Sequence, residues 1–135
     1  MVLSLESNSL TGKVPSELTQ LTWMERLDLS YNSLSGTLPE RIGNMDSLEF
    51  LTLSHNNLTG TIPTSLGQIT KLRSLGLSDN SFTGTLPAEL ADLQSFEAAI
   101  ELGGNEGLVG PMPRSWCDVA IRDFYGDDLC PTEVQ

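Results

Sequence analysis

The amino-acid sequence predicts a solenoid of the α/β class, in which each coil adds one strand to a parallel sheet and one short helical turn. Three observations predict this fold. A unit recurs every 24 residues, leucines alternate with polar residues at its start, and a proline is followed by apolar residues three and six positions later. A unit of this length cannot bury its apolar face alone, so its copies must stack.

The repeat occurs five times. Its copies read, in order, LSLESNSLTGKVP, LDLSYNSLSGTLP, LTLSHNNLTGTIP, LGLSDNSFTGTLP and IELGGNEGLVGPMP. The last copy is one or two residues longer than the others. We therefore expect residues 1–113 to form five repeats, the last one irregular, and residues 114–135 to form a C-terminal cap.

Each copy opens with a predicted strand. Its Leu-x-Leu pattern has the period of two that is typical of a strand with one buried face. Such a strand can bury its leucines only against the next coil, which favours parallel stacking.

An asparagine follows each strand, where the chain turns inward. Its short amide can satisfy backbone groups of the turn and of the adjacent coil. Loss of one such side chain would leave buried polar groups unpaired, at about 1 to 3 kcal/mol each. The predicted structural ladder consists of Asn8, Asn32, Asn56, Asn80 and Asn105.

A glycine and a proline then redirect the chain in each copy. The glycine permits a tight or left-handed backbone. The proline ends strand pairing and fixes φ for a short helical turn, whose apolar residues three and six positions later would point inward.

This pattern resembles the plant-type leucine-rich repeat, LxxLxLxxNxLxGxIPxxLgxLxx, and the resemblance covers residues 2 to about 113. It implies a right-handed superhelix with a concave parallel β-sheet and short helical or 3-10 turns on the convex side. It also implies extra short strands at the Gly-x-Ile-Pro segments. Proteins of this class are commonly secreted or are receptor ectodomains, and they bind peptides, proteins or glycans.

The composition excludes several partners. Seven basic and 18 acidic residues give a net charge of −11, which repels nucleic acid and anionic membranes. No apolar run reaches the roughly 18 to 20 residues of a membrane helix, and the N-terminus lacks the layout of a signal peptide. An extracellular or cell-surface location would therefore belong to a parent protein, and we expect no cofactor.

The repeat stops after Pro113, and the remainder reads as a cap. Apolar residues recur there at helical spacing, at Trp116, Val119, Ala120 and Phe124. Cys117 and Cys130 suit one local disulfide or, alternatively, two buried thiols. A disulfide would stabilise the cap by about 3 kcal/mol in the chain-entropy model.

The other end of the chain begins inside a strand. Leu3 and Leu5 already occupy buried positions of the first copy. Such an end would expose core and an unpaired strand edge, which favours self-association. We therefore also expect that the sequence is a piece of a longer protein.

The candidate ligand-binding residues are those at the start of each copy, in its opening strand and the turn after it, that do not point into the core. Reading the coils in register places Arg26 beside Phe50 and Tyr31 beside His55, about 4.8 Å apart. Arginine beside aromatic residues is typical of interaction hot spots, although this face must be covered by some residues in any case. The predicted contact set is Arg26, Asp28, Tyr31, Phe50, Thr52, His55 and Asp79.

The sequence gives less support to three other kinds of site: a catalytic triad, a metal site and a glycosylation site. His55, Asp79 and nearby serines suggest a catalytic triad, but an open sheet offers no oxyanion site, so we expect no enzyme. The acidic residues of the cap lack a metal-loop signature, so we expect no metal. Asn57-Leu58-Thr59 is a glycosylation sequon that can be used if the protein is exported.

These observations favour a non-enzymatic recognition module for a protein, peptide or glycan, as in receptor-like ectodomains and secreted inhibitors of signalling and defence. The alternative is a structural extracellular or wall component, or a fragment of a receptor-like protein without a ligand site of its own.

Overall fold

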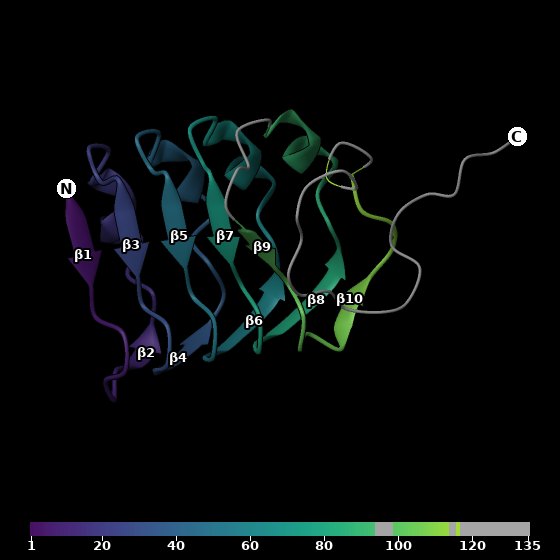
Figure 1. The fold of residues 1–135 in the computed structure, drawn as a ribbon. Helices are drawn as coiled ribbons and strands as arrows, with labels where there is room; N and C mark the ends of the chain where they lie inside the picture. Colours follow the sequence, from purple (N-terminus) through teal and green to yellow (C-terminus); the bar gives the residue numbers. More distant parts are fainter. Residues whose placement is uncertain (94–98, 114–115, 117–135) are drawn as a thin grey trace, which may run out of the picture.

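The computed structural model describes residues 1–93, 99–113 and 116, and it contains two parallel sheets (Figure 1). The first sheet takes one strand from the start of each coil, in the order β1 (Val2–Ser4), β3 (Arg26–Asp28), β5 (Phe50–Thr52), β7 (Ser74–Gly76) and β9 (Ala99–Glu101). The second takes the segment after each asparagine, in the order β2 (Thr11–Lys13), β4 (Ser33–Gly36), β6 (Asn57–Thr61), β8 (Ser81–Thr85) and β10 (Gly107–Val109). The predicted fold class is confirmed.

Short 3-10 helices close the coils on the convex side, behind the first sheet in Figure 1. They are η1 (Ser16–Gln20), η2 (Ile42–Asn44), η3 (Thr64–Gln68) and η4 (Ala88–Asp92). Pro15, Pro63 and Pro87 directly precede three of them, since each proline presets the backbone that a helical turn requires. In the third coil, the apolar residues three and six positions after the proline, Leu66 and Ile69, are fully buried.

The core is a continuous stack of apolar side chains between the two sheets and the helices. Leu51 and Leu75 of the first sheet and Leu58 of the second are fully buried. The first coil differs, because Leu5 and Leu10 remain 38% and 37% exposed. The middle coils therefore carry most of the hydrophobic stabilisation.

The asparagines bond consecutive coils together. The amide of Asn56 donates at 3.0 Å to Leu53 O in its own coil and at 3.0 Å to Leu29 O in the preceding coil. Its Oδ1 accepts the N–H of Leu34, again in the preceding coil, at 3.0 Å. Asn32, Asn80 and Asn105 make the same three bonds. Each of these asparagines thus satisfies backbone groups of the coil before it.

The two ends of the ladder differ from its middle. Asn8 is exposed and bonds to Leu5 O and Glu6 O of its own coil. In the last coil, Leu108 N–H donates to the backbone oxygen of its own Asn105 at 3.1 Å. In earlier coils the equivalent N–H finds the asparagine of the next coil. In the fifth copy, which has the extra residues, a local bond thus satisfies the N–H that would otherwise need a sixth asparagine.

The predicted cap lies mostly outside the described residues. Cys117, Cys130 and the residues of the expected cap helix from 119 onward belong to that part. Trp116, which is described, is fully buried against the last coil.

Candidate functional site

A cluster of two arginines around one aromatic ring lies at the start of the first-sheet strands. Arg26 pairs with Phe50, and Phe50 pairs with Ser74, which confirms the predicted register. The Cζ atom of Arg26 lies 4.4 Å from the centre of the Phe50 ring, and that of Arg73 lies 5.9 Å from it. Both distances are typical of cation–π contacts.

Arg73 was missed by the sequence reasoning. It directly precedes β7, so it falls outside the alternating strand positions from which the contact set was chosen. Its guanidinium also lies 3.7 Å from the carboxylate of Glu49, another residue that directly precedes a strand. The positions directly before β5 and β7 are therefore part of this face.

A second cluster lies beyond the other end of the strands. The rings of Tyr31 and His55 stack with centroids 4.2 Å apart and an interplanar angle of 14°. The Nε2 atom of His55 lies 3.3 Å from Oδ2 of Asp79. Three neighbouring coils thus contribute one side chain each to a continuous row.

The backbone of this row is left-handed, a feature that the sequence reasoning missed. Tyr31, His55 and Asp79 have φ values of 54°, 57° and 52°. Ser7 holds the same position in the first coil with φ of 55°, so this conformation belongs to the turn of the repeat, and residues other than glycine adopt it at a cost. In the fifth coil, Gly104 occupies the same position with φ of 71°, and this glycine before the ladder asparagine was the available signal.

The positions between the two clusters are occupied by a polar row. Asp28 pairs with Thr52, Thr52 with Gly76, and Gly76 with Glu101. The carboxylate of Asp28 accepts hydrogen bonds from the backbone N–H and the hydroxyl of Ser30. Asp28 therefore also supports the local turn. Glu101, which the prediction omitted, adds a negative charge on the same row.

The arrangement around His55 does not resemble a catalytic centre. The side chains of His55 and Asp79 are 41% and 49% exposed on an open sheet. In the part of the chain that the structure describes, no serine hydroxyl bonds to His55. Over the same residues, no three potential metal ligands gather in one place. The geometry is that of an open, solvent-exposed surface.

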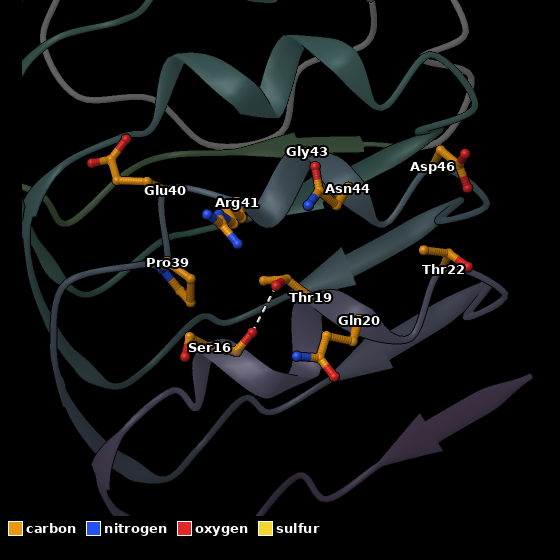
Figure 2. A pocket seen from close by; sticks show the side chains of 10 residues that line it. All are labelled: Ser16, Thr19, Gln20, Thr22, Pro39, Glu40, Arg41, Gly43, Asn44 and Asp46. Atoms are coloured by element: carbon orange, nitrogen blue, oxygen red, sulfur yellow. Dashed lines mark hydrogen bonds between the residues drawn. The ribbon is translucent and has the colours of Figure 1, made fainter.

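A hollow of about 700 Å³ lies on the convex side, between the turns of the first two coils (Figure 2). Figure 2 shows the polar side chains of Gln20, Arg41 and Asn44 among the residues that line it. Two of the lining residues bond to each other, since the hydroxyl of Thr19 donates to Ser16 O at 2.6 Å. None of its lining residues belongs to the predicted contact set.

Two family models match the chain. Both describe the leucine-rich repeat, one over residues 24–82 and the other over residues 1–21. Together they cover 80 of the 135 residues (59 plus 21). No curated protein matches the chain. Among the described residues, no helix has the length and apolar character needed to cross a membrane.

Solved plant structures share the fold. The plant peptide hormone receptor RGFR1, in complex with RGF2, is 36% identical with a TM-score of 0.83, over 90% of this chain and 20% of that one. The ectodomain of the Arabidopsis thaliana membrane receptor kinase GASSHO1/SCHENGEN3 is 40% identical with a TM-score of 0.83, over 91% of this chain and 15% of that one. The chain thus spans a fifth or less of these two receptors.

A third structure of the same fold is a plant ice-binding protein. It is 31% identical, with a TM-score of 0.78, over 89% of this chain and 38% of that one. These matches agree with the 24-residue period, the two parallel sheets and the asparagine bonds. The chain belongs to the plant-type leucine-rich repeat family.

Proposed function

We propose that this chain is a non-enzymatic recognition module that binds a protein or peptide on its concave face, within an extracellular or cell-surface protein. The observation that supports it most is the pair of side-chain clusters at the two ends of the first sheet. Arg26 and Arg73 flank Phe50 at one end, and Tyr31, His55 and Asp79 stack in a row at the other. Arginine and tyrosine are enriched among residues that dominate binding energy.

The charges of this face suit an extended ligand. Two guanidinium groups lie at the start of the strands, while Asp79 and Glu101 lie nearer their ends. A peptide that crosses the sheet with an acidic group near Arg26 and a basic group near Asp79 would match both. A glycan, the other ligand class, would instead stack on the exposed ring of Tyr31.

The test is selection of peptides from a random display library on the purified chain. Arg26→Ala and Phe50→Ala should each weaken the selected peptides by about tenfold or more, since each removes a contact of at least about 1.4 kcal/mol. The matched control is Arg41→Ala, an exposed arginine on the convex side. If all three variants bind like the parent chain, the concave face is not the site; if no peptide is selected at all, the alternative of a structural component is favoured.

Two further proposals concern a glycan on the chain and contacts between copies of the chain. Asn57 is exposed in β6 and, in an exported protein, would carry an N-linked glycan. At the first coil, Val2 is 61% exposed on the unpaired edge of β1, and this edge would support self-association. Mass spectrometry of secreted protein tests the first proposal, and sedimentation over a range of concentrations tests the second.

A second candidate function is adsorption to ice. It is favoured by the likeness to the plant ice-binding protein, together with the uncharged exposed side chains of β4, β6 and β8. The test is slow freezing of a solution of the purified chain around a cold probe. An ice-binding chain enters the growing ice, whereas the chain unfolded beforehand should stay in the liquid. Equal exclusion of both would contradict this function.

A further inference from the structure

The second sheet carries a regular, uncharged array of short polar side chains. Its three central coils read SLSGT (33–37), NLTGT (57–61) and SFTGT (81–85). In each, the first, third and fifth residues are exposed, and the second is buried in the core. The nine exposed positions hold serine or threonine except for one asparagine, in a chain of which 19% is charged. We call these nine positions the hydroxyl face.

Strand pairing fixes the array in two directions. Thr59 pairs with Ser81, and Thr61 pairs with Thr83, so neighbouring rows run across the strands. The paired residues are 22 positions apart in the sequence, whereas residues with the same place in the repeat are 24 positions apart. Each strand is therefore displaced by two residues along its neighbour. A displacement by two preserves the side of the sheet on which each side chain lies.

Glycines hold the threonines of the last column in place. The Cγ2 atom of Thr61 lies 3.2 Å from where a Cβ of Gly84 would be, and that of Thr85 lies 3.3 Å from the same point at Gly110. Each methyl group thus fills the space above the glycine of the next coil. A β-branched side chain seated in this way has few alternative rotamers, so its hydroxyl is held in position.

The array repeats in two directions, as a crystalline surface of water does. Strand geometry places side chains about 4.8 Å apart across the strands and about 6.7 Å apart along them. Hydroxyls held at these fixed spacings can bond to water molecules that are themselves ordered in a lattice. Hydroxyls can replace water molecules of the lattice, while the methyl groups fill the spaces between them. A charged side chain would disturb this order, because it holds its own hydration shell.

We propose that the hydroxyl face is the ice-contacting surface of this chain. This inference rests on the second candidate function and specifies where that function resides. The concave face is unsuitable, since Arg26, Arg73, Asp79 and Glu101 lie on it. The array is also bounded, by Lys13 in the first coil and by Gly107 and Val109 in the last.

Asn57 gives the proposal a second consequence. This residue is both the sequon asparagine and a member of the hydroxyl face, paired with Ser35. A glycan on Asn57 would cover the array. Glycosylation at this site and adsorption to ice therefore exclude each other.

The experiment uses the chain produced in bacteria, which leaves Asn57 unmodified, and measures the lowest concentration that inhibits ice recrystallisation. Thr59→Arg, in the middle of the hydroxyl face, should raise that concentration by about tenfold or more. A tenfold change corresponds to a loss of about 1.4 kcal/mol in the free energy of binding. Thr70→Arg is the matched control, because Thr70 is exposed outside both sheets. It should behave like the parent chain. Circular dichroism of both variants checks that the fold is kept.

The outcomes separate the two claims. If the parent chain neither enters ice nor inhibits recrystallisation, the second candidate function fails and the inference fails with it. If the parent chain is active but Thr59→Arg is equally active, ice binding stands and the hydroxyl face is overturned as its site. Chain secreted with a glycan on Asn57 should be inactive, and Asn57→Gln secreted in the same way should be active. An active glycosylated chain would also overturn the proposal.

Discussion

The methyl carbon of Thr37 lies only 2.7 Å from where the Cβ of an alanine at position 60 would be. Gly60 also has a left-handed φ of 78°. Gly60→Ala should therefore destabilise the chain through both backbone strain and overlap. We expect about 1–2 kcal/mol from strain and at least about 1 kcal/mol more from overlap in the free energy of unfolding, measured by urea denaturation.

Two further variants separate the cost of backbone strain from the cost of overlap. Gly12 has the same left-handed backbone, with φ of 83°, but no atom lies within 4 Å of its would-be Cβ. Gly12→Ala should therefore show the strain alone. Thr37→Ser removes the overlapping methyl group, and combined with Gly60→Ala it should recover the difference. If the double variant is as unstable as Gly60→Ala, the methyl contact is not the cause.

Replacement of Asn56 should destabilise the chain strongly. Asn56→Ala removes the partner of Leu34 N–H and the donor to Leu29 O, both in the preceding coil. Unpaired buried groups cost about 1–3 kcal/mol each, so a loss of at least about 2 kcal/mol is expected in thermal or urea unfolding. Asn8→Ala is the control, because Asn8 is exposed and bonds only within its own coil. Equal losses for both variants would contradict a role in joining the coils.

The His55–Asp79 pair should contribute little to stability. Its two side chains are 41% and 49% exposed, and exposed ion pairs contribute about 0–1 kcal/mol. We therefore expect Asp79→Asn to change the free energy of unfolding by less than about 0.5 kcal/mol, with little dependence on salt. A loss above about 2 kcal/mol would mean that the pair serves the fold, and Asp79 would then be a poor candidate for ligand contact.

Hydrogen exchange should reveal a gradient along the solenoid. Leu51 of β5 is fully buried, whereas Leu5 beside β1 is 38% exposed and its coil has a neighbour on one side only. Amides of β1 should exchange faster than those of β5 at low protein concentration. If β1 becomes protected as the concentration rises, its edge is covered by self-association. Equal protection of both strands in a monomer would contradict the gradient.

The repeat made most of the fold predictable. Once the 24-residue period is recognised, the alternation of leucines gives the first sheet, the asparagines give the bonds between coils, and the prolines give the 3-10 turns. The register that brings Arg26 over Phe50 follows from the same period. Each of these features depends on local spacing, which a sequence displays directly.

Other features depend on how coils lie against one another, and these were not predictable. The two-residue displacement of the second sheet cannot be read from a strict period of 24. The approach of Arg73 to Phe50 depends on side-chain reach from a position outside the strand. The left-handed backbone of Tyr31 is unusual for its residue type, so its identity gave no sign of it, although histidine adopts this conformation more often.

The bonds that the asparagines make between coils all lead to the preceding coil, which gives the stack a direction. Loss of the first coil would remove Leu10 N–H and Leu5 O, the partners of the Asn32 side chain outside its own coil, but its bonds to Leu29 O and Ser30 O would remain. Loss of the last coil would instead leave Phe82 N–H and Leu77 O without the side chain of Asn105. A chain of this kind is therefore easier to shorten, and to lengthen by duplication, at its beginning. Its final coil is the one that must be distinctive, as the local bond from Leu108 to Asn105 makes it.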